Sequence, residues 1–212
     1  MIGNGEGFGN MTDLVDRARA LAVPGRRALL GITGAPGAGK STIAERLVAE
    51  LGESARLVAM DGYHLAQAEL NRLGRTERKG APDTFDALGY IALLARLRRA
   101  DESVVYAPLF DRSLEEPIAC AVPVPREVPL VVTEGNYLLV SDGDWVGVRP
   151  QLDQCWFVDP GEQLRMDWLV ARHERYGRST ETARGRALGS DQRNAEVVAA
   201  TRDRADLVIR SV

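Results

Sequence analysis

The 212-residue sequence predicts an α/β fold in which a parallel sheet carries helices on both faces. Three observations predict it. Short apolar runs alternate with amphipathic segments along the chain, as they do in parallel sheets with crossover helices. The runs are continuously apolar, which is typical of strands buried on both faces. One of them enters a glycine-rich turn that opens into a helix. The length suits one domain and is short for two.

The first half of the chain gives helix and strand signals with clear ends. Leu14, Ala18 and Leu21 share one helical face, Gly52 stops a second helix, and Asp86 is a suitable cap for a third. Residues 62–85, rich in Gly, Arg and Pro, predict a loop and a short helix outside the sheet. The predicted elements are a helix over 11–22, a strand over 27–33, a helix over 41–51, a strand over 55–60 and a helix over 86–99.

The second half continues the alternation. Pro117, Pro123 and Pro125 restrict two β-like segments to short pieces at sheet edges, and Gly189 predicts a break in the last helical stretch. The predicted elements are short strands at 104–106 and 120–124, strands over 129–133 and 152–158, a helix over 161–176, a broken helix over 180–201 and a closing strand over 206–209.

Composition excludes several functions. The formal net charge of -3 gives no electrostatic case for nucleic-acid binding. No apolar run approaches the roughly 18 residues that a membrane helix needs. Residues 1–10 lack the features of a signal peptide and predict a flexible leader. Cys120 and Cys155 show no CxxC spacing, so we expect a reducing, cytoplasmic location. Lys40 and Lys79 are the only lysines among the 27 basic residues.

The strongest motif is a phosphate-binding loop. Gly34-Ala-Pro-Gly-Ala-Gly39-Lys40-Ser41 matches GxxxxGK[ST] between a predicted strand and a predicted helix. In such a loop the backbone N–H groups and the helix N-terminus hold phosphates, the lysine reaches the β- and γ-phosphates, and the serine ligates Mg²⁺. A glycine-rich turn without this role is the alternative. We expect ATP and Mg²⁺ as cofactors, and a three-layer P-loop NTPase fold. The residues expected to bind the nucleotide are Gly34, Ala35, Gly37, Ala38, Gly39, Lys40, Ser41 and Thr42.

Two acidic residues stand at the ends of predicted strands. Asp61 follows ARLVAM and Glu134 follows PLVVT. Ligands of open α/β sheets bind beyond the carboxyl ends of the strands, and both strands are expected to lie near the phosphate-loop strand. Phosphoryl transfer to an alcohol benefits from a carboxylate that accepts the hydroxyl proton, and Mg²⁺ needs an acidic ligand beside Ser41. We therefore expect Asp61 to be the base and Glu134 the metal-side carboxylate; ordinary capping residues are the alternative.

Five segments in order resemble the superfamily of uridine kinases, phosphoribulokinases and bacterial pantothenate kinases. They are residues 34–42, 60–64 (MDGYH), 81–86 (APDTFD), 109–112 (LFDR) and 134–137 (EGNY). The resemblance extends from about residue 27 to the C-terminus. Within the superfamily the chain is most similar to uncharacterised bacterial nucleoside/nucleotide kinase-like proteins, some of which are labelled fructose transport system kinases.

The resemblance implies roles for further residues. It implies that Asp61 is the catalytic base and that Glu134 lies on the metal and substrate side. It also implies that residues of about 62–85 and 108–127 are insertions on the acceptor side. His64, Asp83, Asp111 and Arg112 become candidate substrate contacts; a structural imidazole, a turn residue and a solvated ion pair are the alternatives. Uridine kinases usually carry an Asn/Asp-His pair where this chain has Lys79-Gly80-Ala81, which weakens the case for a nucleoside acceptor.

An arginine-rich segment over about 165–180 is similar to the lid of that superfamily, although its spacing differs. It contains Arg165, Arg172, Arg175 and Arg178. A basic flap closing over ATP would stabilise the transferred charge and exclude water. We expect Arg172 to be catalytic and Arg175 to bind the nucleotide. A solvated face of an arginine-rich protein is the alternative.

Together these features predict a single kinase domain over residues 1–212 that transfers the γ-phosphoryl group of Mg·ATP to a small-molecule hydroxyl. A sugar such as fructose, a nucleoside and a pantothenate-like compound remain open as acceptors. A GTPase-like or non-catalytic nucleotide-binding protein is the alternative, but the chain has no guanine-reading Asn-Lys-x-Asp. A nucleoside-monophosphate kinase would need arginines at the acceptor and no base, against which Asp61 argues. The resemblance is compatible with a homodimer.

Overall fold

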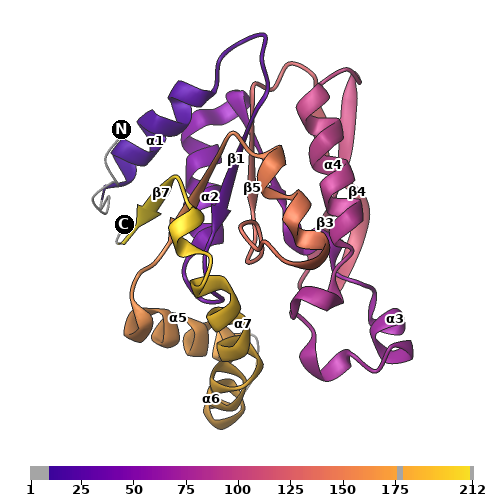
Figure 1. Ribbon diagram of the computed structural model, residues 1–212, viewed down its shortest axis with the longest axis vertical. Coiled ribbons are helices and arrows are strands. Elements are labelled where there is room, and N and C mark those ends of the chain that lie inside the picture. Colours follow the sequence, from indigo (N-terminus) through magenta and orange to yellow (C-terminus); the bar gives the residue numbers. More distant parts are fainter. Residues whose placement is uncertain (1–9, 176–178, 211–212) are drawn as a thin grey trace.

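The computed structural model describes residues 10–175 and 179–210. Its main feature is a five-stranded sheet in the order β2-β5-β1-β6-β7, in which every neighbouring pair is parallel (Figure 1). The strands are β1 (Ala28–Thr33), β2 (Ala55–Ala59), β5 (Leu130–Glu134), β6 (Gln154–Val158) and β7 (Leu207–Ile209). β1 and β5 are buried along their whole length. The α/β P-loop NTPase fold predicted from the sequence is confirmed.

Helices cover both faces of this sheet and form two separate cores. The helices are α1 (Met11–Leu21), α2 (Lys40–Leu51), α3 (Gln67–Arg72), α4 (Ala87–Arg99), α5 (Glu162–Arg175), α6 (Thr180–Leu188) and α7 (Ser190–Ala199). One core joins Leu14 of α1 and Leu47 of α2 to the sheet. The other joins Leu94 of α4 and Val198 of α7 to the opposite face. The break between α6 and α7 falls at Gly189, as the sequence predicts.

The helix ends follow the local chemistry of the sequence. Asp86 caps α4 by accepting a hydrogen bond from the backbone N–H of Gly89 at 2.8 Å. Asn10 caps α1 in the same way through Thr12. Gly52 ends α2 with a φ of 56°, a conformation that glycine adopts without strain.

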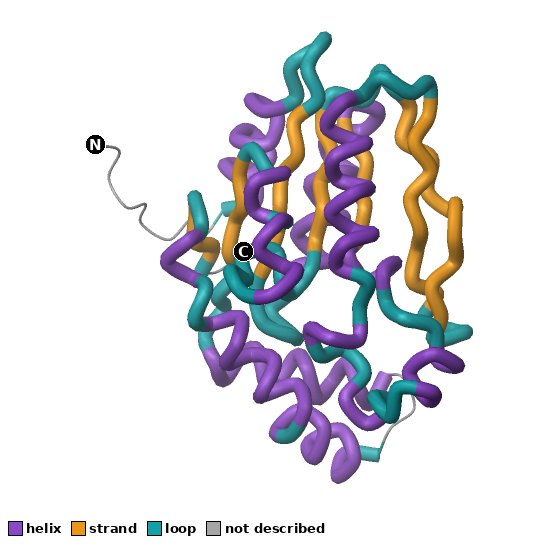
Figure 2. Tube along the Cα trace, turned by 45° about the vertical axis from the view of Figure 1, so that its right-hand side comes forward, coloured by secondary structure: helices purple, strands orange, loops and turns teal. Residues whose placement is uncertain are grey.

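Two further strands form a separate antiparallel ribbon, β3 (Val104–Asp111) and β4 (Glu116–Pro125). The prediction of short segments at 104–106 and 120–124 is wrong in extent, because both strands are much longer. Each strand of a two-stranded ribbon keeps one unpaired edge, and proline is tolerated at such an edge without loss of a ladder hydrogen bond. The three prolines therefore did not limit β4. In Figure 2 the ribbon runs along one side of the molecule.

The carboxyl ends of the parallel strands meet at one edge of the sheet, and α5, α6 and α7 lie together beyond that edge (Figure 1). Ile32 of β1 and Ala59 of β2 both pair with Glu134 of β5, so Glu134 ends a strand beside the phosphate-loop strand. β2, which leads to Asp61, pairs with β5 and is one strand further out. We expected both acid-bearing strands to lie near β1. β5 is its direct neighbour, and β2 is separated from it by β5.

No helix among the described residues is both long and apolar enough to cross a membrane.

Arg27, just before β1, offers a test of how the sheet is tied to the α4 side. It is buried, and its guanidinium donates to the carbonyl oxygens of Val128 at 2.9 Å, Leu97 at 3.2 Å and Pro125 at 2.5 Å. We expect Arg27→Met to lower the free energy of unfolding by about 3 kcal/mol, because buried carbonyls lose their donors. Urea unfolding measures this.

The adjacent Arg26 provides the control. Its side chain is exposed and contacts Asp153, so Arg26→Met should change the unfolding free energy by no more than about 1 kcal/mol. Equal effects of the two substitutions would contradict a structural role for Arg27.

Candidate active site

The loop between β1 and α2 has the backbone geometry that phosphate binding requires. Gly37 and Gly39 have φ of +84° and +89°, the left-handed region that side chains avoid. A Cβ at Gly37 would lie 2.8 Å from the carbonyl oxygen of Arg165, so there is also no space for one. The predicted nucleotide-binding residues Gly34 to Gly39 form this loop, and Lys40, Ser41 and Thr42 form the first turn of α2.

Lys40 lies buried at the start of α2. Its Nζ donates to the carbonyl oxygen of Ala35 at 3.0 Å. Burial lowers the pKa of Lys40 to about 8; Glu134 and Asp61 act against this shift, and Arg172 and Arg112 add to it. Four further charged side chains therefore lie close enough to act on the ammonium group. The structure brings the predicted catalytic residues Lys40, Asp61 and Arg172 into one electrostatic cluster.

Ser41 and Glu134 supply oxygens beside this lysine. The Ser41 hydroxyl donates to Glu134 Oε1 at 3.2 Å, and the Glu134 side chain is buried. Burial, followed by the charge of Asp61, raises the pKa of Glu134, while Lys40 and Ser41 lower it. A hydroxyl and a carboxylate are the hard oxygen ligands that Mg²⁺ takes from P-loop proteins, with phosphates and water completing its shell. The two side chains thus fit a magnesium ion.

Asp61 occupies a different environment. It lies in the 3₁₀ turn Met60–Tyr63 that follows β2, and about a quarter of its side chain is exposed. Its Oδ2 accepts a hydrogen bond from Arg112 of the ribbon turn at 3.2 Å. A carboxylate that is accessible, oriented by a guanidinium and close to the phosphate loop is suited to accept a proton from a bound hydroxyl.

His64 directly follows the turn that carries Asp61. Its ring contacts Phe85 and Phe110, with centroid distances of 3.9 and 4.7 Å, and its Nδ1 lies 2.9 Å from the carbonyl oxygen of Asp61. Burial lowers the pKa of His64. The imidazole is therefore neutral at pH 7 and forms an aromatic wall beside the candidate base.

Asp83 and Asp111 have structural partners of their own. Asp83 pairs with Arg78 at 2.7 Å and Arg75 at 3.4 Å. Asp111 Oδ1 accepts hydrogen bonds from the backbone N–H and hydroxyl of Ser113, at 2.8 and 2.6 Å, in the turn of the ribbon. These bonds lower the pKa of Asp111. Their role as substrate contacts stays a prediction.

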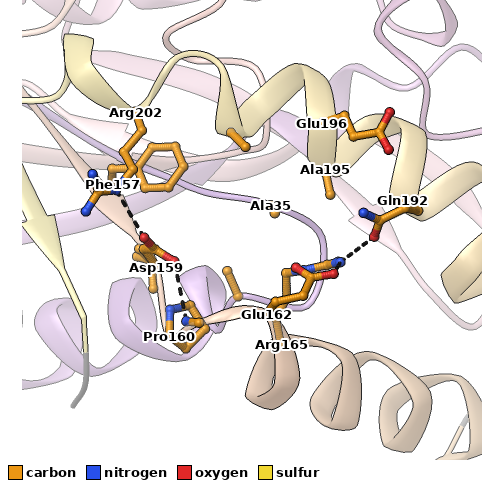
Figure 3. Close-up of a pocket in the computed structure, with 14 residues that line it drawn as sticks. Ala35, Phe157, Asp159, Pro160, Glu162, Arg165, Gln192, Ala195, Glu196 and Arg202 are labelled. Atoms are coloured by element: carbon orange, nitrogen blue, oxygen red, sulfur yellow. Dashed lines mark hydrogen bonds and ion pairs between the residues drawn. The ribbon is translucent and has the colours of Figure 1, made fainter.

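Arg165 differs from Arg172 of the predicted lid, whose side chain is exposed. It is buried, pairs with Glu162 at 2.7 Å, and donates to Gln192 of α7 at 2.6 Å and to the carbonyl oxygen of Pro36 in the phosphate loop at 3.1 Å. Figure 3 shows the Arg165 side chain pointing toward Gln192. Both residues line a pocket of about 140 Å³. Arg165 therefore stabilises the phosphate loop through its bond to Pro36 and does not belong to an exposed flap.

Arg172 is exposed on α5 and acts on the pKa of Lys40. Arg178 and the side chain of Arg175 lie outside the described residues, as do residues 1–9 of the predicted leader.

Trp168 is a site residue to which the sequence analysis gave no role. Its ring lies 3.3 Å from the position that a Cβ of Gly39 would take, and 44% of the residue is exposed. The available signal was its spacing, since Trp168 is one helical turn before Arg172 and residues four apart share a helix face. The same face of α5 thus presents an aromatic ring and a cation to the phosphate loop.

Comparison with known proteins agrees with this geometry. A protein of Schizosaccharomyces pombe provisionally named uridine kinase C227.14 is 31% identical over 76% of this chain and 69% of its own length. A solved structure from Silicibacter sp. TM1040, provisionally described as a fructose transport system kinase, is 34% identical and superposes with a TM-score of 0.85, covering 95% of this chain and 99% of that one. The chain therefore belongs to the P-loop kinases of the uridine kinase and pantothenate kinase superfamily.

Two other matches cover less. Pantothenate kinase of Shewanella loihica is 28% identical over 70% of this chain, which spans half of that protein. The family model described as methylmalonyl Co-A mutase-associated GTPase MeaB matches residues 10–62. That match includes the phosphate loop and stops just after Asp61.

The lowered pKa of Lys40 predicts a pH-dependent stability. Below about pH 8 the folded, nucleotide-free protein holds a desolvated ammonium, and the unfolded chain holds a hydrated one. Between about pH 8 and 10.5 the folded state loses this proton first, so stability rises with pH through that window. A shift of this size corresponds to about 3 kcal/mol. We expect Lys40→Met to be more stable than the wild type at pH 7.

Chemical denaturation between pH 7 and 10.5 gives the free energy of unfolding of the wild type and of Lys40→Met. Groups that titrate equally in both proteins cancel in the difference between the two values. The advantage of Lys40→Met should shrink by up to about 3 kcal/mol across this range. A difference that is constant with pH would contradict a buried, charged Lys40.

Proposed function

We propose that the protein transfers the γ-phosphoryl group of Mg·ATP to a hydroxyl group of a small molecule. The observation that carries the proposal is the cluster at the sheet edge. A phosphate-loop lysine, a serine–carboxylate pair suited to Mg²⁺ and a separate, accessible carboxylate act on one another electrostatically. A nucleotide-binding protein without an acceptor would not need the last of these.

In this proposal Asp61 accepts the proton of the acceptor hydroxyl. The hydroxyl oxygen forms a bond to the γ-phosphorus while the bond from that phosphorus to the β–γ bridging oxygen breaks, and ADP leaves. Lys40 and Arg172 stabilise the charge on the transferred group. Magnesium, when bound, neutralises phosphate charge, and Ser41 and Glu134 would hold it.

The different environments of the two acids support their different roles. Glu134 is buried and hydrogen-bonded to Ser41, so an acceptor molecule has little access to it. Asp61 is partly exposed, its carboxylate contacts Arg112, and its backbone carbonyl contacts His64. The acid that can meet an acceptor is thus distinct from the acid that can meet a cation.

The relatives support the general class of acceptor. Their names refer to uridine, pantothenate and a fructose transport system, and uridine, pantothenate and fructose all carry free hydroxyl groups. The MeaB match covers residues 10–62 only, and a GTPase would need the guanine-reading motif that the sequence lacks. A small-molecule kinase therefore accounts for more of the site.

Asp61→Asn tests the base directly. We expect kcat to fall by roughly 10² or more, because the amide cannot accept the hydroxyl proton, while the Kd for ATP changes little. Steady-state kinetics with an acceptor found by an ATP-consumption screen, together with calorimetry for ATP, measure both. Asp16→Asn, an exposed change on α1, is the control. An unchanged kcat in Asp61→Asn would remove Asp61 from the chemistry.

Arg172→Ala tests the proposed lid. An arginine placed on the transferred phosphoryl group contributes on the order of 10³-fold to the rate, and closure keeps water away from it. We expect transfer to fall and the ratio of ATP hydrolysis to transfer to rise. Arg99→Ala, which removes an exposed arginine paired with Asp101, is the control. A ratio equal to that of the control would count against the lid.

A further inference from the structure

Lys79 is a largely buried cation whose hydrogen-bond partners are neutral. Its side chain is only 16% exposed. Among the described residues its Nζ bonds to the carbonyl oxygen of Glu115 at 2.6 Å and the amide oxygen of Gln67 at 3.3 Å. The closest carboxylate oxygen, from the 60% exposed side chain of Glu115, is 3.8 Å away. Buried ammonium groups usually have a close anionic partner, so this environment calls for an explanation.

The loop that carries Lys79 is held firmly in position. The carbonyl oxygen of the next residue, Gly80, accepts hydrogen bonds from the Tyr137 hydroxyl at 2.5 Å and the Asn194 amide at 3.2 Å. Tyr137 follows Glu134 by three residues, and Asn194 lies on α7. Lys79 is thereby fixed relative to the phosphate-loop side of the site.

Lys79 and Arg112 meet at one aromatic ring. The Lys79 ammonium lies 5.3 Å, and the Arg112 guanidinium carbon 6.0 Å, from the centroid of Phe110. Both cations lower the pKa of His64, which packs on the same ring, so both lie near it. In the described part of the chain, one carboxylate lies within hydrogen-bond distance of either cation. It is the carboxylate of Asp61, which contacts Arg112.

The neighbouring acids do not neutralise this pair. The carboxylate of Glu115 is mostly in water, where its charge is screened. The carboxylate of Glu116 accepts hydrogen bonds from the backbone N–H of Gln67 at 3.1 Å. Asp61 is the proposed base and must be available to the hydroxyl. In the described chain Lys79 therefore has no carboxylate within hydrogen-bond distance, and the carboxylate that Arg112 contacts is that of the candidate base.

We propose that the acceptor is an anion, a hydroxy acid or a phosphorylated polyol, whose carboxylate or phosphate binds between Lys79 and Arg112 while its hydroxyl meets Asp61. The inference rests on the proposed function and names its substrate class. A guanidinium offers a planar fork of donors to such a group, and an ammonium adds a point charge. Because Arg112 already contacts Asp61 at 3.2 Å, the anion and the reacting hydroxyl lie only a few bonds apart.

Matched pairs of acceptors test this class. Each pair differs in the anion: D-glycerate and glycerol, pantothenate and its alcohol, fructose 6-phosphate and fructose. ADP release at saturating Mg·ATP gives kcat/KM for each compound. We expect the anionic member of the accepted pair to be favoured by at least about 100-fold, because its neutral partner brings no charge to Lys79 and Arg112. Which pair is accepted also shows whether the anionic group of the acceptor is a carboxylate or a phosphate. A neutral member that is used equally well or better overturns the inference.

Lys79→Met and Lys79→Arg locate the effect. We expect Lys79→Met to raise KM for the anionic acceptor about tenfold or more, with kcat and the Kd for ATP within a few-fold of the wild type, and Lys79→Arg to restore part of the affinity. Arg72→Met removes an exposed cation paired with Glu69 on α3 and is the matched control. An anion preference that survives Lys79→Met undiminished overturns the role of Lys79.

Calorimetry of the same pairs with protein loaded with a non-hydrolysable ATP analogue separates the two possible failures. Anion binding that depends on Lys79 but gives no product in any pair would support the inference and contradict the kinase. Turnover of a neutral acceptor that is lost in Asp61→Asn would support the kinase and overturn the inference. Equal binding of charged and neutral members, or binding of neither, would also overturn it.

Discussion

The site depends on one buried charge, the ammonium group of Lys40. It is the first residue of α2, it is desolvated, and its one hydrogen bond in the described chain goes to the carbonyl of Ala35. A buried cation is costly unless opposite charges stand near it. Glu134 and Asp61 meet this requirement from two other segments. The strand order, with β5 beside β1 and β2 beside β5, is the arrangement that brings both acids to the lysine.

The same requirement separates the two acids into two environments. Glu134 ends β5 within the sheet and is buried, and burial favours its protonated form. A divalent cation at Ser41 and Glu134 would favour the ionised form again, so metal binding and the charge of Glu134 are coupled. Asp61 lies beyond its strand in a turn and retains access to solvent. The carboxyl edge of the sheet thus carries one buried carboxylate, that of Glu134, and one accessible carboxylate, that of Asp61.

The rest of the site is assembled from segments outside the sheet. Arg112 comes from the ribbon turn, Lys79 from the loop after α3, and Arg165 from the start of α5. Each is fixed by hydrogen bonds to another segment: Arg112 to Asp61, the Lys79 loop through Gly80 to Tyr137, and Arg165 to Pro36. These hydrogen bonds hold the loop after α3 and the ribbon against the acceptor side of the site, and α5 against the phosphate loop.

The sequence by itself determined the parts of this protein whose signals are local. The phosphate loop depends on glycines at fixed spacing between an apolar strand and a helix, and Asp61 and Glu134 are marked by the ends of apolar runs; the order of the parallel α/β elements follows from the same alternation. Tertiary structure alone decided what depends on distant neighbours. Arg165 supports the phosphate loop because α5 packs against Pro36 and Gln192. β4 is long because it has a single partner strand. Lys79 is only partly exposed because its ammonium lies over Phe110 and bonds to the carbonyl oxygen of Glu115. Spacing along a chain specifies local conformation, whereas burial and charge pairing arise from contacts between residues far apart in sequence.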